Sequence, residues 1–135
     1  MDNFSVTILN NEKTKLKSEF YMALLPLYEG ETGIMAGHVN YNALIAPGLL
    51  KLLHKDGRVL NTMFISGGIA EVLDGKLTIL ADNIIDIQDI THEEALAKVN
   101  NLKESLQDIS LEIEQIEYLS QELQAYNKII NQKFN

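Results

Sequence analysis

Three histidines are the side chains best suited to acid–base or metal chemistry, and their spacing supports neither. They occupy positions 38, 54 and 92 of the 135-residue chain. No His-x-x-x-His or Glu-x-x-His pattern places two ligands on one helix face, so we expect no metal site. The sequence contains no cysteine, which excludes disulfides, thiolate ligands and cysteine nucleophiles.

Glycine-rich stretches invite a phosphate-binding interpretation, which their spacing also contradicts. Gly30, Gly33 and Gly37 match neither a dinucleotide-binding fingerprint nor a Walker loop. Gly75-Lys76 is followed by Leu77, where a Walker loop needs a Ser or Thr to bind magnesium. These glycines are better interpreted as turns between strands.

Nucleophilic and anion-binding groups are equally sparse. Ser66 lacks the glycine two residues upstream that a nucleophile elbow requires. The single arginine, Arg58, is too little for a bidentate phosphate clamp. The sequence therefore predicts no catalytic residues and no cofactor.

Charge and hydropathy exclude further classes. The formal net charge of −8 argues against a nucleic-acid binder and against docking on anionic lipid. No apolar run approaches the roughly 20 residues of a membrane span, so a membrane would be reached only through a partner. The start of the chain has neither an apolar signal core nor a basic, amphipathic transit-like segment, which favours a bacterial source.

Glycine and proline divide the chain into two parts. All eight glycines and both prolines lie between Pro26 and Gly75. Because these residues interrupt regular structure, we expect a β domain over residues 1–90 and a helical tail over residues 91–135. Each part carries a net charge of −4.

The first part has the pattern of short strands. Phe4, Val6 and Ile8 alternate with polar residues at a period of two. Further strands are expected over residues 20–27, 49–53, 59–65, 69–73 and 77–81, with turns at Glu29-Gly30-Glu31, Lys55-Asp56-Gly57, Ser66-Gly67-Gly68 and Asp74-Gly75. Many short strands at this spacing predict a sandwich or barrel.

The second part has the pattern of helix. Thr91 and Glu94 form the Ser/Thr-x-x-Glu capping box. Apolar residues then recur at helical spacing in two stripes, the first being Ala95, Leu96, Val99, Leu102 and Leu106, and the second Ile109, Ile113, Ile116, Leu119, Leu123, Tyr126 and Ile130. Asp108 and Ser110 are candidate caps at a break between two helices, although one continuous helix remains open.

Three segments, in order, resemble one known family. Residues 30–38 (Gly-Glu-Thr-Gly-Ile-Met-Ala-Gly-His) are similar to the Gly-Glu-x-Gly-Ile-x-Pro-Gly-His loop of F-type ATP synthase epsilon subunits. Residues 44–50 resemble the next segment, which ends in Pro-Gly before a strand. Residues 64–72, continued by residues 77–82, resemble the Val-Ser-Gly-Gly-x-x-Glu-Val signature.

The resemblance implies a ten-stranded β sandwich followed by an antiparallel two-helix hairpin. It implies a non-catalytic central-stalk subunit of the proton-translocating ATP synthase, which couples rotation of the c ring to ATP synthesis on the beta subunits. The implied partners are the gamma subunit, the c-subunit ring and, through the helical tail, the alpha and beta subunits. The implied location is the cytoplasmic face of the bacterial plasma membrane.

The resemblance also implies a contact site. The loop holding Glu31, with Thr32, Gly33 and His38, is expected to meet the polar loops of the c ring. A short acidic loop can pair with basic side chains there, while a merely solvated Glu31 remains the alternative. Ala36 replaces the usual Pro, and Val39-Asn40 the usual Ala-Pro, which predicts a less rigid loop.

The tail departs further from the family. In many bacterial relatives its basic side chains face an acidic segment of beta and inhibit ATP hydrolysis. Here residues 91–135 contain four lysines, no arginine and eight acidic residues, which predicts a weak or conditional inhibitor. The ATP-binding pattern Ile-Asp-x-x-Arg-Ala of some relatives becomes Ile-Thr-His-Glu-Glu-Ala over residues 90–95, so we expect no ATP binding there.

Two other function classes remain to be weighed. A free-standing β-sandwich adaptor with a coiled-coil tail fits the same pattern and predicts no binding to gamma. An unrecognised enzyme requires a cleft with converging polar groups, for which the sequence offers no support.

Overall fold

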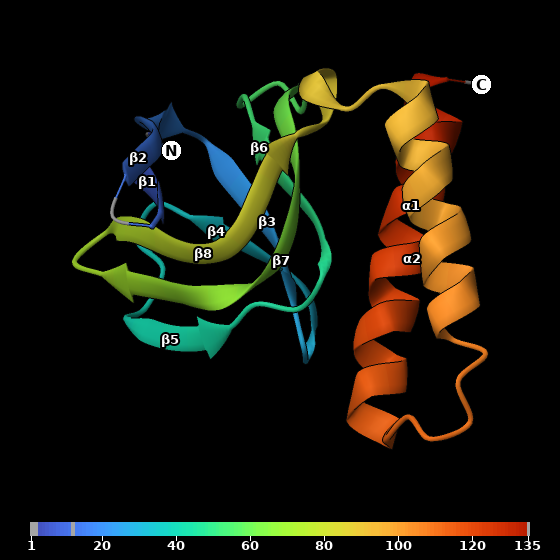
Figure 1. The fold of residues 1–135 in the computed structure, drawn as a ribbon. Helices are drawn as coiled ribbons and strands as arrows, with labels where there is room; N and C mark the ends of the chain where they lie inside the picture. Colours follow the sequence, from blue (N-terminus) through green and yellow to red (C-terminus); the bar gives the residue numbers. More distant parts are fainter. Residues whose placement is uncertain (1–2, 12, 135) are drawn as a thin grey trace.

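The computed structural model describes residues 3–11 and 13–134 as a β sandwich followed by two packed helices (Figure 1). The strands are β1 (Phe4–Asn10), β2 (Lys13–Phe20), β3 (Met22–Leu27), β4 (Gly30–Met35), β5 (Tyr41–Leu44), β6 (Gly48–Leu53), β7 (Val59–Leu73) and β8 (Lys76–Asp86). The short 3-10 turn η1 (Ile87–Asp89) leads to the helices α1 (His92–Ser105) and α2 (Ile113–Lys133). The expected class, β sandwich plus helical hairpin, is confirmed.

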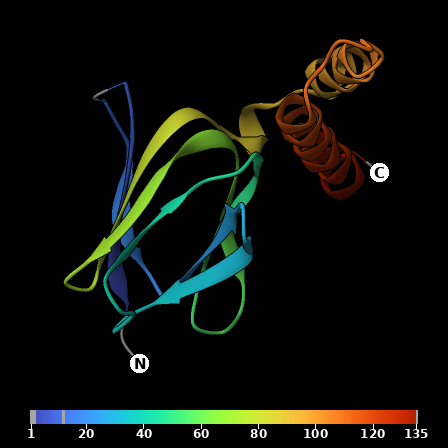
Figure 2. The ribbon, with the colours of Figure 1, turned by 90° about the horizontal axis from the view of Figure 1, so that it is seen from below.

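One continuous sheet forms both layers of the sandwich (Figure 2). Its order is β2-β1-β8-β7-β6-β3-β4, with β5 also pairing with β7. Among the described strands only β1 and β8 run parallel; the other pairs are antiparallel. The first half of β7 pairs with β6 and the second half with β5, so this strand belongs to both layers.

The expected turn at Ser66-Gly67-Gly68 is wrong. β7 continues through it in register with β8, Ser66 lying opposite Asn83 and Gly68 opposite Ala81. Both glycines have positive φ (79° and 128°), and a side chain at Gly68 would collide with the Leu80 carbonyl. The pair therefore bends the strand without ending it. Since β7 and β8 serve both layers, the described residues form eight strands rather than ten.

Alternating apolar side chains fill the space between the layers. In β1, Phe4, Val6 and Ile8 point inward, as their period predicts. The side chains of the core that are buried completely include Leu25, Ile34, Leu50, Leu52, Ile65 and Ile79.

The helices begin and end much as the sequence predicts. The Thr91 hydroxyl accepts from the Glu94 N–H at 3.1 Å and the Glu94 carboxylate accepts from the Thr91 N–H at 3.1 Å, which confirms the capping box. The two-helix hairpin is also confirmed, but Asp108 and Ser110 do not cap α2. The Asp108 carboxylate accepts from Ser110 within the connection, and α2 starts after Glu112, whose N–H donates to the Gln115 side chain.

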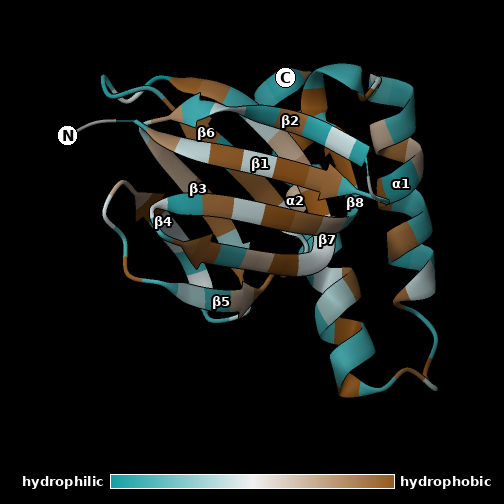
Figure 3. Cartoon of the chain, turned by 90° about the vertical axis from the view of Figure 1, so that its left-hand side faces the viewer, coloured by the Kyte–Doolittle hydropathy of each residue, from teal (hydrophilic) through white to brown (hydrophobic). Residues whose placement is uncertain are grey.

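The second predicted apolar stripe is only half correct. Ile109 is fully exposed, and Ile113 and Ile116 are 71% and 42% exposed. The later residues of the stripe are correct, because Tyr126 is buried and Leu119, Leu123 and Ile130 pack beside it, and the buried face also contains Ala125 and Ile129, which the stripe omitted. Ile109 belongs to the connection between the helices, and Ile113 and Ile116 belong to the first turns of α2, at the end of the hairpin that projects beyond the sandwich (Figure 3). Across the described ranges, neither helix is long and apolar enough to cross a membrane.

Candidate functional site

The residues expected in one contact loop lie on a strand and beyond its far end. Glu31, Thr32 and Gly33 belong to β4, where Glu31 pairs with Pro26 and Gly33 with Leu24 of β3. The Gly30–His38 segment is therefore mostly a hairpin strand, and the expectation of a loop around Glu31 is wrong. Backbone pairing with β3 holds these residues in place.

His38 lies at the other end of β4. Its backbone N–H donates to the Met35 carbonyl at 3.1 Å, and its ring packs on Tyr41 with 5.1 Å between centroids. About 13 Å of extended strand, from Glu31 to Met35, separates the two ends. Glu31 and His38 therefore do not form a single compact site.

Glu31 lies at the junction between the sandwich and the tail. It lines a polar cleft of about 190 Å³ together with Lys51 of β6 and Lys128 of α2. The side-chain oxygen of Gln121, on the same cleft, is buried and has no partner among the described residues. Glu31 itself is exposed, so its carboxylate is accessible to a basic group.

The loop after β4 has an anchor that sequence reasoning missed. The Asn40 side chain accepts a hydrogen bond from the Asp74 N–H at 2.9 Å, across 34 residues. This hydrogen bond ties the loop after β4 to the β7–β8 turn. A single Asn gives no sequence signal of such a long-range partner.

An apolar row crosses the outer face of the sandwich and was also missed. Cross-strand pairing places Leu9 of β1 beside Leu80 of β8, Leu80 beside Ile69 of β7, and Ile69 beside Leu44 of β5. Leu44, Ile69 and Leu80 are exposed. We call these four residues the outer row. Contiguous exposed apolar side chains of this kind mark contact surfaces.

The tail packs on the first halves of β6 and β7. Phe64, fully buried, contacts Tyr126 with 4.7 Å between ring centroids at 52°. Leu49 and Ile90 join them in one cluster with Ala95, Val99, Leu102, Ala125 and Ile129 of the helices. This docking cluster is separate from the sandwich core and holds the hairpin against the sandwich.

Lys133 adds a polar clasp at the end of α2. Its ammonium group donates to the carbonyls of Ile87, Gln88 and Ile90 at 2.7, 2.9 and 2.7 Å. Those carbonyls lie in the segment that connects β8 with α1. One cation therefore ties the last turn of α2 to the segment that precedes α1.

One carboxylate is buried between the helices. Glu122 is 6% exposed, and it faces the Lys98 ammonium of α1 at 3.8 Å. Burial raises the pKa of Glu122, and Lys98 lowers it by a smaller amount. The tail thus contains an acidic group that is costly to keep ionised.

The start of α1 uses its polar groups for the fold of the tail. Thr91 and Glu94, at the positions of the family's Asp and Arg, bond to each other in the capping box. The His92 ring stacks on Phe134 at 4.7 Å. The absence of ATP binding stays a prediction.

Comparison with known proteins decides the family. Residues 3–87 match the family model described as ATP synthase, Delta/Epsilon chain, beta-sandwich domain. An ATP synthase epsilon chain from Gluconacetobacter diazotrophicus is 34% identical over 100 residues, covering 74% of this chain and 70% of the relative. The chain belongs to the ATP synthase epsilon chain family.

Other members extend the likeness. The Bordetella petrii epsilon chain is 33% identical over 108 residues, covering 80% of this chain and 76% of its own length. In fold, the chain is similar to a solved chain of the Euglena gracilis mitochondrial ATP synthase, OSCP/F1/c-ring, with a TM-score of 0.75 at 22% identity over 96% of this chain and 81% of that one. The chain is also similar in fold to a chain of the Tetrahymena thermophila mitochondrial ATP synthase central stalk/c-ring structure. The TM-score is 0.61 at 16% identity, and the match covers 92% of this chain and 93% of that one.

Membership in the epsilon family confirms the expected role at the level of the complex. The chain is a non-catalytic subunit of the membrane-associated ATP synthase, the complex that makes ATP. The epsilon chain of Paramagnetospirillum magneticum is related at 32% identity over 101 residues, which is 75% of each chain.

Proposed function

We propose that this epsilon chain couples rotation of the c ring to the catalytic subunits as part of the central stalk. In this role residues 1–90 form the rigid part that touches the rotor, and residues 91–135 form the tail that reaches the alpha and beta subunits. A tightly packed sandwich suits such a task, because a close-packed interior transmits strain instead of absorbing it.

The outer row is the observation that supports a contact with the gamma subunit. Leu9, Leu80, Ile69 and Leu44 place apolar side chains side by side across four strands. The tail covers the other half of β7 and leaves this row open. We propose that the outer row contacts the gamma subunit in the assembled enzyme.

The contact with the c ring is assigned to the start of β4. Glu31 and Gly33 are exposed there and Thr32 is partly so, at the end of the β3–β4 hairpin. The exposed carboxylate of Glu31 suits a basic side chain on the ring. His38 lies at the opposite end of β4, so a contact of His38 with the same ring loop would need a broader interface.

The tail is assigned a weak or conditional inhibitory role. Its net charge of −4 opposes binding to an acidic segment of beta. The docking cluster and Lys133 favour a resting state with the hairpin on the sandwich. The proposed location is the cytoplasmic face of a bacterial plasma membrane, reached through the complex.

A binding experiment with purified gamma tests the proposal. The doubly substituted chain Ile69→Glu, Leu80→Glu is expected to bind gamma at least about tenfold more weakly, because charges replace the centre of the apolar contact. Leu60→Glu is the matched control, since Leu60 is an exposed leucine on β7 outside the outer row. If the unsubstituted chain, the double variant and the Leu60→Glu variant bind gamma equally well, the outer row is not the gamma-binding surface.

The unsubstituted chain discriminates between functions in the same assay. If it does not bind gamma at all, the free-standing adaptor is the better interpretation.

A further inference from the structure

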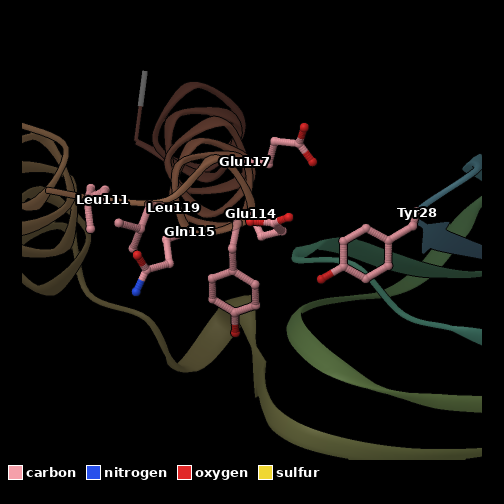
Figure 4. Close-up of a pocket in the computed structure, with 7 residues that line it drawn as sticks. Tyr28, Leu111, Glu114, Gln115, Glu117 and Leu119 are labelled. Atoms are coloured by element: carbon pink, nitrogen blue, oxygen red, sulfur yellow. The ribbon is translucent and has the colours of Figure 1, made fainter. Parts of the chain in front are cut away.

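A cavity of about 640 Å³ lies between the β3–β4 turn and the beginning of α2 (Figure 4). Tyr28 forms the wall on the sandwich side, and its ring faces the α2 side chains across the space. Leu111, Tyr118 and Leu119 supply apolar surface on the tail side. The volume falls within the range typical of ligand and peptide-anchor sites.

The rim of this cavity is acidic. Glu114 and Glu117 line it, and among the described residues no lysine, arginine or histidine does. Tyr28, Tyr118 and Glu117 all line the cavity, and partial burial raises the pKa of Tyr28, with Tyr118 and the Glu117 carboxylate adding to the shift. Two aromatic rings with carboxylates beside them form the kind of surroundings that attract an ammonium or guanidinium group.

The part of the tail around the cavity is also acidic and exposes apolar side chains. Between Lys103 and Lys128 the sequence has six acidic residues and no basic one. At the same end of the hairpin, Ile113 and Ile116 are exposed on α2 and Ile109 on the connection, although none of the three lines the cavity. The tip of the hairpin is thus a surface both apolar and strongly negative.

Charge decides among the partners that such a surface could bind. A second copy of the tail would bring the same negative charge to the contact and be repelled. An anionic lipid surface is disfavoured for the same reason. A segment with apolar and basic residues on neighbouring faces matches both properties of the surface, the apolar side chains entering the cavity and the basic ones reaching Glu114 and Glu117.

We propose that this cavity binds a basic amphipathic helix of another protein and that the bound helix holds the tail against the sandwich. The second part follows from the walls of the cavity. Tyr28 belongs to the sandwich and the other lining residues to the tail, so the site is complete only while the tail is docked. A ligand that binds one of two states shifts the population toward that state. The proposal stands on these residues and does not depend on the contact with gamma or with the c ring.

The test uses the full chain and a fluorescent synthetic helix of about 15 residues with leucines on one face and arginines on the other. The matched peptide carries glutamates in place of the arginines. We expect the arginine peptide to bind and the glutamate peptide not to, with affinity falling as salt rises from about 0.1 M to about 0.5 M.

Variants of the chain locate the site. Glu114→Gln with Glu117→Gln is expected to weaken binding of the arginine peptide about tenfold. Glu19→Gln with Glu71→Gln removes the same charge from exposed sandwich positions and is expected to change binding less than about twofold. Tyr28→Ala removes the sandwich wall at an exposed turn position and is expected to weaken binding while circular dichroism stays unchanged.

Hydrogen exchange tests the clamping. Amides in the part of α2 that carries the buried residues Ala125, Tyr126 and Ile129 should exchange more slowly with the arginine peptide bound than without it. Equal binding of the two peptides, no binding at millimolar peptide, or no effect of the Glu114 and Glu117 substitutions would overturn the proposal. Self-association that competes with the peptide, or binding to phosphatidylglycerol vesicles in its place, would assign the surface to another occupant and overturn it as well.

Discussion

The sandwich and the tail bury their apolar side chains in different ways. The sandwich core is closed on itself: residues from both layers, such as Val6, Leu25, Leu52 and Ile79, are completely buried without help from the helices. The docking cluster contains residues of both parts. The buried side chains of the helices pack there against Leu49, Phe64 and Ile90 of the first part.

The difference indicates that one part is a platform and the other a detachable element. A sheet with its own core keeps its shape when a neighbour leaves, whereas an amphipathic hairpin needs a surface for its apolar face. The tail also leaves Ile109, Ile113 and Ile116 unpacked. Substitutions in the two parts should therefore have different consequences, global in the first and local in the second.

The largest effect is expected in the sandwich core. Ile79→Ala should lower the free energy of unfolding by about 4 kcal/mol, because the fully buried side chain leaves a cavity in a packed interior. Leu60→Ala, an exposed position on β7, should change it by less than about 0.5 kcal/mol. Urea denaturation followed by circular dichroism measures both. Similar losses for the two variants would contradict a self-contained core.

A second substitution tests whether the tail can leave by itself. Tyr126→Ala removes the ring that packs on Phe64 and should weaken docking of the tail by about 3 kcal/mol. Hydrogen exchange should become faster in α1 and α2 and remain unchanged in β1 and β8. Asn127→Ala, at an exposed neighbouring position, is the control. Faster exchange throughout the sandwich would show that the two parts unfold as one.

The hydrogen bonds of Lys133 should contribute less to docking of the tail than the Tyr126 ring does. Lys133→Met keeps most of the aliphatic stem but removes the donors to the carbonyls of Ile87, Gln88 and Ile90. We expect a loss of about 1.5 kcal/mol in docking, since water replaces part of these bonds. Lys103→Met, at an exposed position of α1 away from the sandwich–tail junction, should have almost no effect. Exchange of the α2 amides distinguishes the two variants.

Unlike Tyr126 and Lys133, Glu122 should weaken docking of the tail at neutral pH, and its effect should be smaller than theirs. Burial between the helices raises the pKa of Glu122, so the packed hairpin, which is the form that docks, keeps the proton to higher pH than an unpacked tail does. Docking is therefore strongest at acid pH and loses stability as the pH rises through the raised pKa.

The matching variant is Glu122→Gln. It should strengthen docking at pH 7 by less than about 1 kcal/mol, since Lys98 offsets part of the cost of burial. The difference should vanish at a pH below the ordinary carboxyl pKa. Exposed Glu93→Gln serves as control. If the Glu122→Gln variant docks more weakly at pH 7, the ion pair with Lys98 outweighs the cost of burial.

The same two parts differ in how far the sequence predicted them. The alternation in β1 and the Thr91 capping box are local signals, and both appear in the structure as expected. The bend at Gly67-Gly68 was mistaken for a turn because positive φ is compatible with both, and only the pairing with β8 distinguishes them.

The functional surfaces were harder to predict than the strands. Glu31, Thr32, Gly33 and His38 belong to one contiguous motif, but the first three lie at the start of β4 and His38 lies beyond its far end. The outer row joins residues as far apart as Leu9 and Leu80, which become neighbours only through strand order. The side of α2 that packs on the sandwich depends on where the hairpin docks, which its periodicity does not specify.

The smallest effect is expected from removing the tail of the assembled enzyme. Truncation after Ile90 deletes α1 and α2 but leaves every described strand and the outer row in place. A tail with eight acidic residues and four lysines has little attraction for an acidic segment of beta. ATP hydrolysis should therefore rise less than about twofold, while ATP synthesis should be retained because the contacts that we propose with the rotor lie on the sandwich. Restoring positive charge makes the decisive comparison: Glu114→Lys with Glu117→Lys should make the tail more inhibitory than the natural one. A large rise in hydrolysis on truncation, with synthesis intact, would show instead that this tail inhibits without the basic side chains, and that its apolar tip at Ile109, Ile113 and Ile116 supplies the contact.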